Sequence, residues 1–147
     1  MPSMFDSLEI SSSGLSAQRM RMKVISSNIA NVNTTRTPGG GPYRRKDVIF
    51  GALPPHKNFL EELKNQSQDN GVRHVKVLGI VEDQKAAKLV YNPHHPDANE
   101  EGYVAMPNVD ITEEMTNLLV AKRSFEANIA AMNATKQMLS KALEIGR

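Results

Sequence analysis

Apolar residues recur at intervals of seven along residues 110–145, and a second set follows four residues after the first. A seven-residue apolar period is typical of a helix that keeps one side against a partner helix. No Gly or Pro interrupts these residues, and Asp110 can cap the first turn, with Glu113 reaching back in a capping box. The pattern predicts a long C-terminal helix. Its apolar seam consists of Ile111, Leu118, Phe125, Met132 and Leu139 in a first row and Met115, Ile129 and Leu143 in a second row.

A weaker seven-residue pattern opens the chain and includes Ser-Ser-Ser-Gly at residues 11–14. These residues form helices poorly, and Gly costs about 1 kcal/mol relative to Ala. Such a helix is marginal alone in water, so we expect it to need a partner, for which the C-terminal helix is the first candidate. We also expect the ends of the isolated chain to be mobile. The N-terminal part of the seam would come from Leu8, Leu15, Met22, Ile25 and Ile29.

The N-terminal pattern ends in an Asn- and Thr-rich segment at residues 28–35. These side chains bond to nearby backbone and compete with helix, and Asn tolerates the left-handed conformation that closes a helix end. The segment therefore predicts a helix terminus. Its amides can also bond to neighbouring chains in an assembly.

Residues 37–43, Thr-Pro-Gly-Gly-Gly-Pro-Tyr, predict a loop, and Arg-Arg-Lys follows at once. The spacing of a phosphate-binding loop is missing. We expect instead a solvated basic loop that meets an acidic partner surface, so that reversing its charges leaves the isolated fold intact. The residues predicted to contact neighbouring subunits are Asn28, Asn31, Arg36, Tyr43, Arg44, Arg45 and Lys46.

The middle of the chain predicts short strands at residues 47–50, 72–81 and 88–91. A brief helical pattern covers residues 58–66, and residues 69–71 and 99–102 predict turns. The fold class is therefore mainly α with a small β insertion, in which the two heptad helices pair as a coiled-coil-like inner domain. The divisions are residues 1–35 (N-terminal helix), 36–46 (basic loop), 47–107 (β unit) and 108–147 (C-terminal helix).

Composition narrows the function classes. An apolar share of 39% with 5% aromatic residues and no Trp suits an elongated assembly of helices better than a dense core. A net charge of +2 favours neither nucleic acid nor an acidic membrane surface, and the absence of Cys excludes disulfides and thiolate metal sites. No apolar run approaches the ~18 residues of a membrane span. The first thirty residues lack the apolar core of a cleavable signal peptide.

Chemistry-bearing residues are sparse. His94, His95 and Asp97 form the one metal-like cluster, but adjacent side chains in an extended segment point apart. Glu113 and Glu114 are neighbours on a helix, where adjacent residues do not face each other, so they are expected to be solvated first-turn charges. No nucleophile motif is present. We therefore expect neither an enzyme nor a bound cofactor or metal.

Two other classes remain open at this point: a coiled-coil adaptor or interaction protein, and a nucleic-acid binder that uses the basic loop. A nucleic-acid binder would lose affinity steeply with salt. It would usually carry aromatic residues near its basic stretch, where this chain has only Tyr43 close by.

Several segments together carry a family resemblance. They are Ser-Gly-Leu-Ser-Ala-Gln-Arg at 13–19, Ser-Ser-Asn-Ile-Ala-Asn at 26–31, Thr-Thr-Arg-Thr-Pro at 34–38, Gly-Pro-Tyr-Arg-Arg-Lys at 41–46, Gly-Tyr-Val-Ala-Met-Pro-Asn-Val-Asp at 102–110, Phe-Glu-Ala-Asn at 125–128, Ala-Met-Asn-Ala-Thr-Lys at 131–136 and Ala-Leu-Glu-Ile-Gly-Arg at 142–147. In these segments the sequence resembles the bacterial flagellar basal-body rod proteins, and within them the FlgC family of the proximal rod.

The resemblance implies a structural subunit of the axial drive shaft that transmits motor torque in the periplasmic space. It implies helical assembly with copies of itself and other rod proteins, delivery through the flagellar type III export gate without a cleavable signal peptide, no membrane insertion and no nucleic-acid partner. Rod and hook proteins often carry Phe followed four residues later by an aliphatic residue near the N-terminus for that gate. Here Phe5 is followed by Glu9, while Met4 and Leu8 keep only the spacing.

Overall fold

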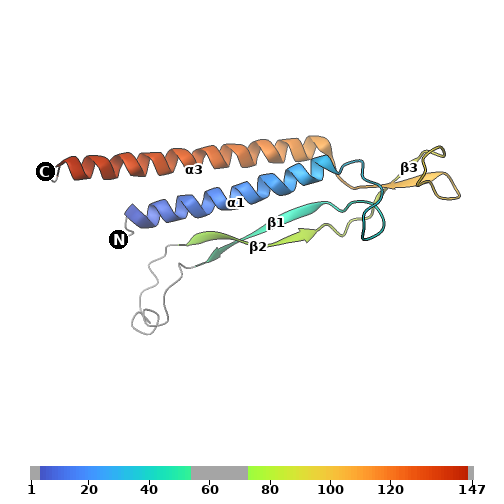
Figure 1. The fold of residues 1–147 in the computed structure, drawn as a ribbon, viewed down its shortest axis with the longest axis horizontal. Coiled ribbons are helices and arrows are strands. Elements are labelled where there is room, and N and C mark those ends of the chain that lie inside the picture. Colours follow the sequence, from blue (N-terminus) through green and yellow to red (C-terminus); the bar gives the residue numbers. More distant parts are fainter. Residues whose placement is uncertain (1–3, 54–72, 146–147) are drawn as a thin grey trace, which may run out of the picture.

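The structure, a computed structural model, describes residues 4–53 and 73–145. Within these residues, two long helices bracket short strands (Figure 1), which confirms the predicted class of a mainly α chain with a small β insertion. The helical pattern at 58–66 and the turn at 69–71 lie outside the described residues. The elements are α1 (Met4–Ala30), β1 (Lys46–Leu53), β2 (His74–Glu82), β3 (Lys88–Tyr91), β4 (Tyr103–Met106) and α3 (Ile111–Ile145).

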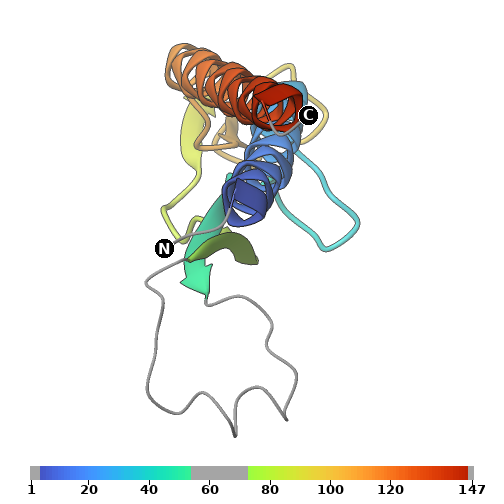
Figure 2. The same ribbon diagram turned by 90° about the vertical axis from the view of Figure 1, so that its left-hand side faces the viewer.

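Helix α1 is the central layer of the molecule. It lies between α3 on one side and the β1–β2 pair on the other (Figures 1 and 2), and α3 contacts no other described element. Ala17, Val24 and Ile25 of α1 are buried between these layers. Burial on two sides explains why a segment of weak propensity is helical. The C-terminal helix is thus confirmed as the partner of α1, and it pairs with α1 within one chain, although the sequence predicts ends that stay mobile until assembly.

The two long helices run antiparallel in a single register (Figure 1). Steps of seven or fourteen residues along α1 correspond to equal steps back along α3. The contacts include two side-chain hydrogen bonds and one close approach, in which a Cβ built on the glycine would lie 3.1 Å from the facing amide. The facing pairs are Ser7 with Thr135, Gly14 with Asn128 and Asn28 with Glu114.

The residues of α3 that face α1 most closely form one column, which falls three residues after the predicted first row. Ala121 is 0% exposed and Thr135 is 4% exposed in this facing column. Small side chains let the helix axes approach closely, so they occupy the line of contact ahead of larger apolar residues. The facing column is Glu114, Ala121, Asn128 and Thr135.

The predicted seam therefore divides between two surfaces. Ile25 of α1 is buried, while most of the remaining α1 seam and the later first-row positions of α3 are half-buried. The second row faces solvent and does not pair with α1 in this chain, so its predicted place in an assembly seam stays a prediction. The half-buried residues are Leu8, Leu15, Met22, Ile29, Leu118, Phe125, Met132 and Leu139, and the exposed ones are Ile111, Met115, Ile129 and Leu143.

The strands form two separate antiparallel pairs, β1–β2 and β3–β4. Val48 is the buried residue of β1, and a bulge lies between Ile49 and Phe50. The three predicted strands are confirmed where the structure describes them. Residues 103–106, where the sequence analysis names no strand, form strand β4 because β3 pairs with them.

Both predicted helix boundaries at the junction with the β unit are present. Helix α1 ends at Ala30, where the Asn31 amide donates to the Ser27 carbonyl and itself accepts from the Thr34 hydroxyl. No non-glycine described residue has a positive φ, so side-chain bonds, not a left-handed Asn, close this helix. Asp110 caps α3 by accepting from the Thr112 and Glu113 backbone N–H groups, and these bonds lower the pKa of Asp110.

Candidate functional site

Asn28 lies where the end of α1 meets the start of β1 and the first turn of α3. Its amide nitrogen donates to Oε2 of Glu114 at 2.9 Å and to the Lys46 carbonyl at 2.8 Å. Its oxygen accepts from the Lys46 backbone N–H at 2.9 Å and from the Tyr43 hydroxyl at 3.0 Å. Two N–H groups and two lone pairs are the full capacity of an Asn side chain. Asn28 is therefore saturated and, at 0% exposure, closed to other chains.

Glu114 supplies a buried negative charge to the same point. Nε of Arg45 donates to its Oε1 at 2.7 Å, and the other guanidinium nitrogens lie 3.8 Å from Asp47 and 3.7 Å from Glu113. Burial acts against the charged form of Arg45, but the hydrogen bond and charge of Glu114, with the two flanking carboxylates, outweigh it and raise the pKa of Arg45. A buried carboxylate needs such a partner, because an unpaired buried charge is strongly destabilising. We call Asn28, Tyr43, Arg45, Lys46 and Glu114 the Asn28 junction.

The junction corrects two predictions from the sequence. Arg45 is not a solvated cation, since its side chain is 20% exposed and paired with Glu114. Glu114 is not a solvated first-turn charge, since it is fully buried. The sequence does carry a signal for Glu114, because it begins the seven-residue column of small and polar residues that continues through Ala121 and Asn128.

The other predicted loop contacts lie outside the junction. Arg44 is exposed and donates to the Gln84 side chain at 3.3 Å, and Arg36 is exposed. Lys46 directs its ammonium group to Glu82 at 3.6 Å and lies 5.9 Å from the centre of the Tyr43 ring. Arg44, Arg45 and Lys46, which follow the loop, thus each contact another residue of the same chain.

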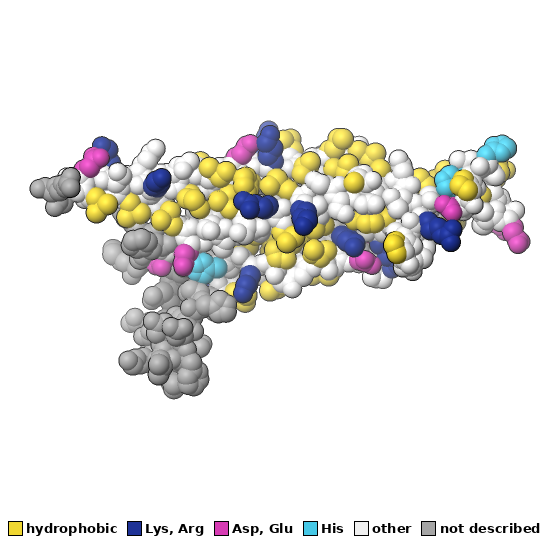
Figure 3. All heavy atoms as spheres, viewed as in Figure 1, with side chains coloured by type: hydrophobic (Ala, Val, Ile, Leu, Met, Phe, Trp, Pro, Cys, Tyr) yellow, Lys and Arg dark blue, Asp and Glu magenta, His cyan; other side chains and the backbone are white. Residues whose placement is uncertain are grey.

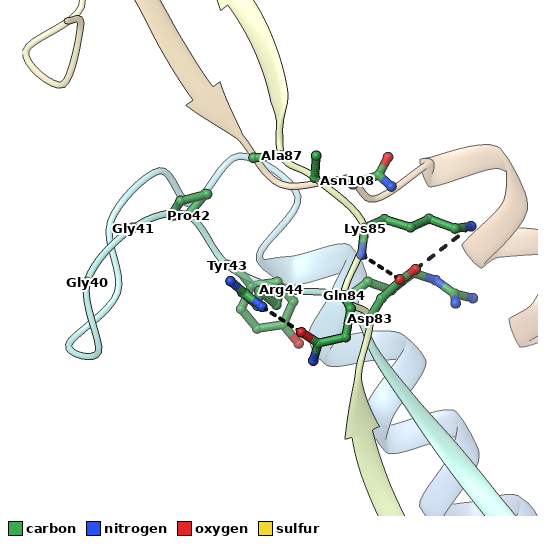
Figure 4. Close-up of a pocket in the computed structure, with 12 residues that line it drawn as sticks. Gly40, Gly41, Pro42, Tyr43, Arg44, Asp83, Gln84, Lys85, Ala87 and Asn108 are labelled. Atoms are coloured by element: carbon green, nitrogen blue, oxygen red, sulfur yellow. Dashed lines mark hydrogen bonds and ion pairs between the residues drawn. The ribbon is translucent and has the colours of Figure 1, made fainter.

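The glycine-rich loop projects from a closed base. The Tyr43 N–H donates to the Thr34 carbonyl, and the Thr37 N–H donates to the Gly41 carbonyl. Gly40 and Gly41 have positive φ values of 84° and 73°, which side chains other than Gly rarely adopt. A pocket of about 210 Å³ lies between this loop, residues 83–87 and residue 108 (Figure 4).

The pocket carries charges that are already paired. Figure 4 shows Arg44 pointing to Gln84, and Lys85 pointing to Asp83 from the opposite side of the pocket. The Lys85 ammonium lies 3.9 Å from the Asp83 carboxylate. A mixed, paired surface of this kind lacks the convergent unpaired donors of a phosphate site.

The second row of α3 forms an exposed apolar line, which we call the outer row: Met115, Ile129 and Leu143. Their exposed fractions are 57%, 39% and 74%. Lys122 and Lys136 stand between them at the same spacing. Hydrophobic side chains gather along the helix pair, with Lys and Arg interspersed (Figure 3). Further exposed apolar residues of α3 are Ile111, Leu119, Val120, Met138 and Ile145.

His95 and Asp97, from the metal-like cluster, form hydrogen bonds in the connection between β3 and β4. Nδ1 of His95 accepts from the Asp97 backbone N–H, and the Asp97 carboxylate accepts from the Thr35 hydroxyl at 2.8 Å. Across residues 4–53 and 73–145, no three His, Asp or Glu side chains are grouped to hold a metal ion. None of the described helices has the length and apolarity needed to cross a bilayer.

Comparison with known proteins places the whole chain beside one group. Residues 8–36 match the family model "Flagella basal body rod protein", and residues 100–145 match "Flagellar basal body rod FlgEFG protein C-terminal". The chain is 48% identical to the flagellar basal-body rod protein FlgC of Bacillus subtilis, with 97% of this chain and 98% of the relative covered. It is 43% identical to FlgC of Borreliella burgdorferi, with 97% of each covered, and 36% identical to FlgC of Aquifex aeolicus, with 98% of each covered.

Proposed function

The chain belongs to the FlgC family of flagellar basal-body rod proteins, and from this we propose that it is a proximal-rod subunit that buries the outer row of α3 against neighbouring subunits. As a member of this family it is a structural component of the flagellar basal body that assembles with other rod components.

The exposed outer row is the observation that supports this contact. Met115, Ile129 and Leu143 leave an apolar line along α3, on a helix whose one described packing partner is α1. Fully burying a Leu, Ile or Met side chain contributes about 1.5–3 kcal/mol. A line of such residues along a helix roughly 50 Å long favours a partner that lies alongside it.

Side-by-side burial also suits the mechanical role that we propose. Subunits in contact along most of a helix resist rotation against one another, because interdigitated side chains must separate before the helices can slide. A shaft built this way transmits motor torque with little internal twist. We infer no catalytic role for the chain.

We further propose that the chain reaches the periplasmic rod through the flagellar export gate. The spacing of Met4 and Leu8 offers a partial gate signal, whereas Phe5 with Glu9 does not.

A charge in the outer row tests the proposed contact. Ile129→Lys should change the unfolding free energy of the isolated chain by at most about 1 kcal/mol, because position 129 is already 39% exposed and the Lys stem can lie along the same surface, and should abolish rod assembly and motility. Thr116→Lys is the matched control, since it adds the same charge at an exposed polar position of α3. Export of both variants is measured in the periplasmic fraction. Normal motility with Ile129→Lys would rule out the outer row as a contact surface.

A further inference from the structure

Small and polar side chains recur every seven residues along the α1–α3 contact line. Ser7 and Gly14 on α1 face small or uncharged residues of the facing column on α3. A shift by one heptad would set Ser7 opposite Asn128 and Gly14 opposite Ala121, again with small side chains on one or both sides. The backbone of α3 packs against α1 and against no described strand, so the contact that the shift would disturb on this side is the bond of Glu114 to Arg45, directly before β1. Packing at Ser7 and Gly14 therefore discriminates weakly between the two registers.

Charge does not reject the shifted register either. Arg21 lies one heptad before Asn28, so the shift would bring it opposite Glu114 and supply a cation to that carboxylate. The shift would carry residues 25–30 of α1, including buried Ile25 and Asn28, beyond the start of α3, and Asn28 would lose its bond to Glu114. We propose that Asn28 and Glu114 are positioning residues that select the register of α1 on α3.

The hydrogen bonds of Asn28 connect α1 to two other parts of the chain, and this allows it to select the register. Its amide joins α3 through Glu114 and joins the start of β1 through both backbone groups of Lys46. Arg45 then ties the same segment to Glu114. Three elements are thus held at one residue, and all four hydrogen bonds form together only in the native register. This role concerns folding within one chain, so it stands apart from the proposed outer-row contact.

A pair of cysteine reporters can read the register directly, because the chain contains no cysteine. Ser7→Cys with Thr135→Cys reports the native register, since the two hydroxyl oxygens lie 3.4 Å apart. Ser7→Cys with Asn128→Cys reports the shifted register. Each pair is oxidised in the full-length chain with oxidised glutathione, and disulfide yield is measured by mass spectrometry.

Two substitutions remove the proposed selector from different helices. Asn28→Ala removes the amide, and Glu114→Ala removes the carboxylate while Arg45 keeps Glu113 and Asp47 within 3.7 Å and 3.8 Å. Hydrogen bonds to charged groups stabilise a fold more than those between neutral groups. We therefore expect Asn28→Ala to move the ratio of the two disulfides toward the shifted register by about tenfold, equivalent to ~1.4 kcal/mol. Glu114→Ala should move this ratio less, because it also removes the carboxylate that Arg21 would face in the shifted register.

Two further variants separate register selection from general packing. Glu114→Gln keeps a carbonyl oxygen for Asn28 and should restore the native disulfide. Ser27→Ala removes a neighbouring hydroxyl that contacts Tyr43 at 3.3 Å but not Glu114, and should also keep the native disulfide. Helix content is followed by circular dichroism in every variant.

The two disulfide yields and the helix content together distinguish three results. A raised shifted disulfide with retained helix content in Asn28→Ala, together with a smaller rise in Glu114→Ala, supports the proposal. A native disulfide alone in Asn28→Ala would overturn it and assign the register to packing, including that of buried Ile25 and Val109. Loss of helix content together with both disulfides would also overturn it, because the junction would then stabilise the fold without selecting a register.

Discussion

Arg45 donates a 2.7 Å hydrogen bond to Glu114, a carboxylate that is completely buried although it lies in the first turn of a helix. The pair joins the segment after the glycine-rich loop to α3, across 69 residues of sequence. Because of this pair, two neighbouring cations after the loop have different roles. Arg45 is part of the fold, whereas Arg44 is exposed and available to other molecules.

Charge reversal at these two positions should therefore give opposite results. Arg45→Glu places a second carboxylate against Glu114 and should lower the free energy of unfolding by about 2–4 kcal/mol, somewhat below the value for a fully buried pair because Arg45 is partly exposed. Arg44→Glu should change it by less than about 0.5 kcal/mol. Urea unfolding of both variants measures the difference. Equal stability of the two variants would mean that the pair contributes little to the fold.

Phe125→Ala should have an effect in the isolated chain as well as in the assembly. Phe125 is half-buried on the first row, so its truncation should cost about 1–3 kcal/mol, less than the 3–5 kcal/mol of a fully buried Phe. Thermal unfolding of the purified chain measures this cost. An unchanged melting temperature would support the earlier expectation that the helices pair only on assembly.

Gly14→Leu should separate α1 from α3. The Asn128 amide already lies 3.1 Å from the position of a Cβ on Gly14, so a larger side chain must displace it. Overpacking of this kind costs about 1–3 kcal/mol, which exceeds the gain of about 1 kcal/mol in helix propensity. Ser12→Leu, at an exposed position two residues away, is the control and should be neutral or stabilising. The comparison is made by denaturant unfolding, and a stabilised Gly14→Leu variant would contradict the close approach.

Asp110 should contribute an acid-sensitive part of the stability. Hydrogen bonds from the Glu113 and Thr112 N–H groups lower its pKa below the ordinary 3.8, so the folded state favours the carboxylate. The contribution is present above the unfolded pKa and is lost as the pH falls through the lower, folded value. Asp110→Asn keeps a capping oxygen and should match the parent near neutral pH.

The measurement for Asp110 is the slope of unfolding free energy against pH in the acid range below 3.8. The parent should lose more stability than Asp110→Asn over this range. Parallel curves for the two chains would show that the cap gains nothing from the charge.

Truncation of Met115 in the outer row should weaken subunit association more than it weakens the fold of the isolated chain. Met115→Ala truncates a side chain that is 57% exposed in the isolated chain, so unfolding should change by less than about 1 kcal/mol. In the assembled rod the same truncation should weaken subunit association by up to about 2 kcal/mol, through lost apolar burial. Sedimentation of assembled rods against free chain measures the second effect, and an unaltered distribution would place the contact elsewhere.

Sequence alone determined the order and type of the elements. The seven-residue period at residues 110–145 requires a long helix because no Gly or Pro interrupts it and Asp110 caps its start. Local chemistry likewise ended α1 in the Asn-rich segment and placed the glycine-rich loop after it. These features depend on interactions between residues close in the chain, so sequence spacing is enough to predict them.

Tertiary structure decided which side of each helix is buried. Rows three and four residues after the first row are both compatible with the heptad period, and only close approach at Gly14 and Ala121 selects the column of small residues over the apolar outer row. The same approach buries Glu114, which a local rule assigns to solvent, because Asn28 and Arg45 arrive from distant parts of the chain to satisfy it. Partners separated by 69 and 86 residues cannot be read from local spacing, since their meeting depends on how the layers pack.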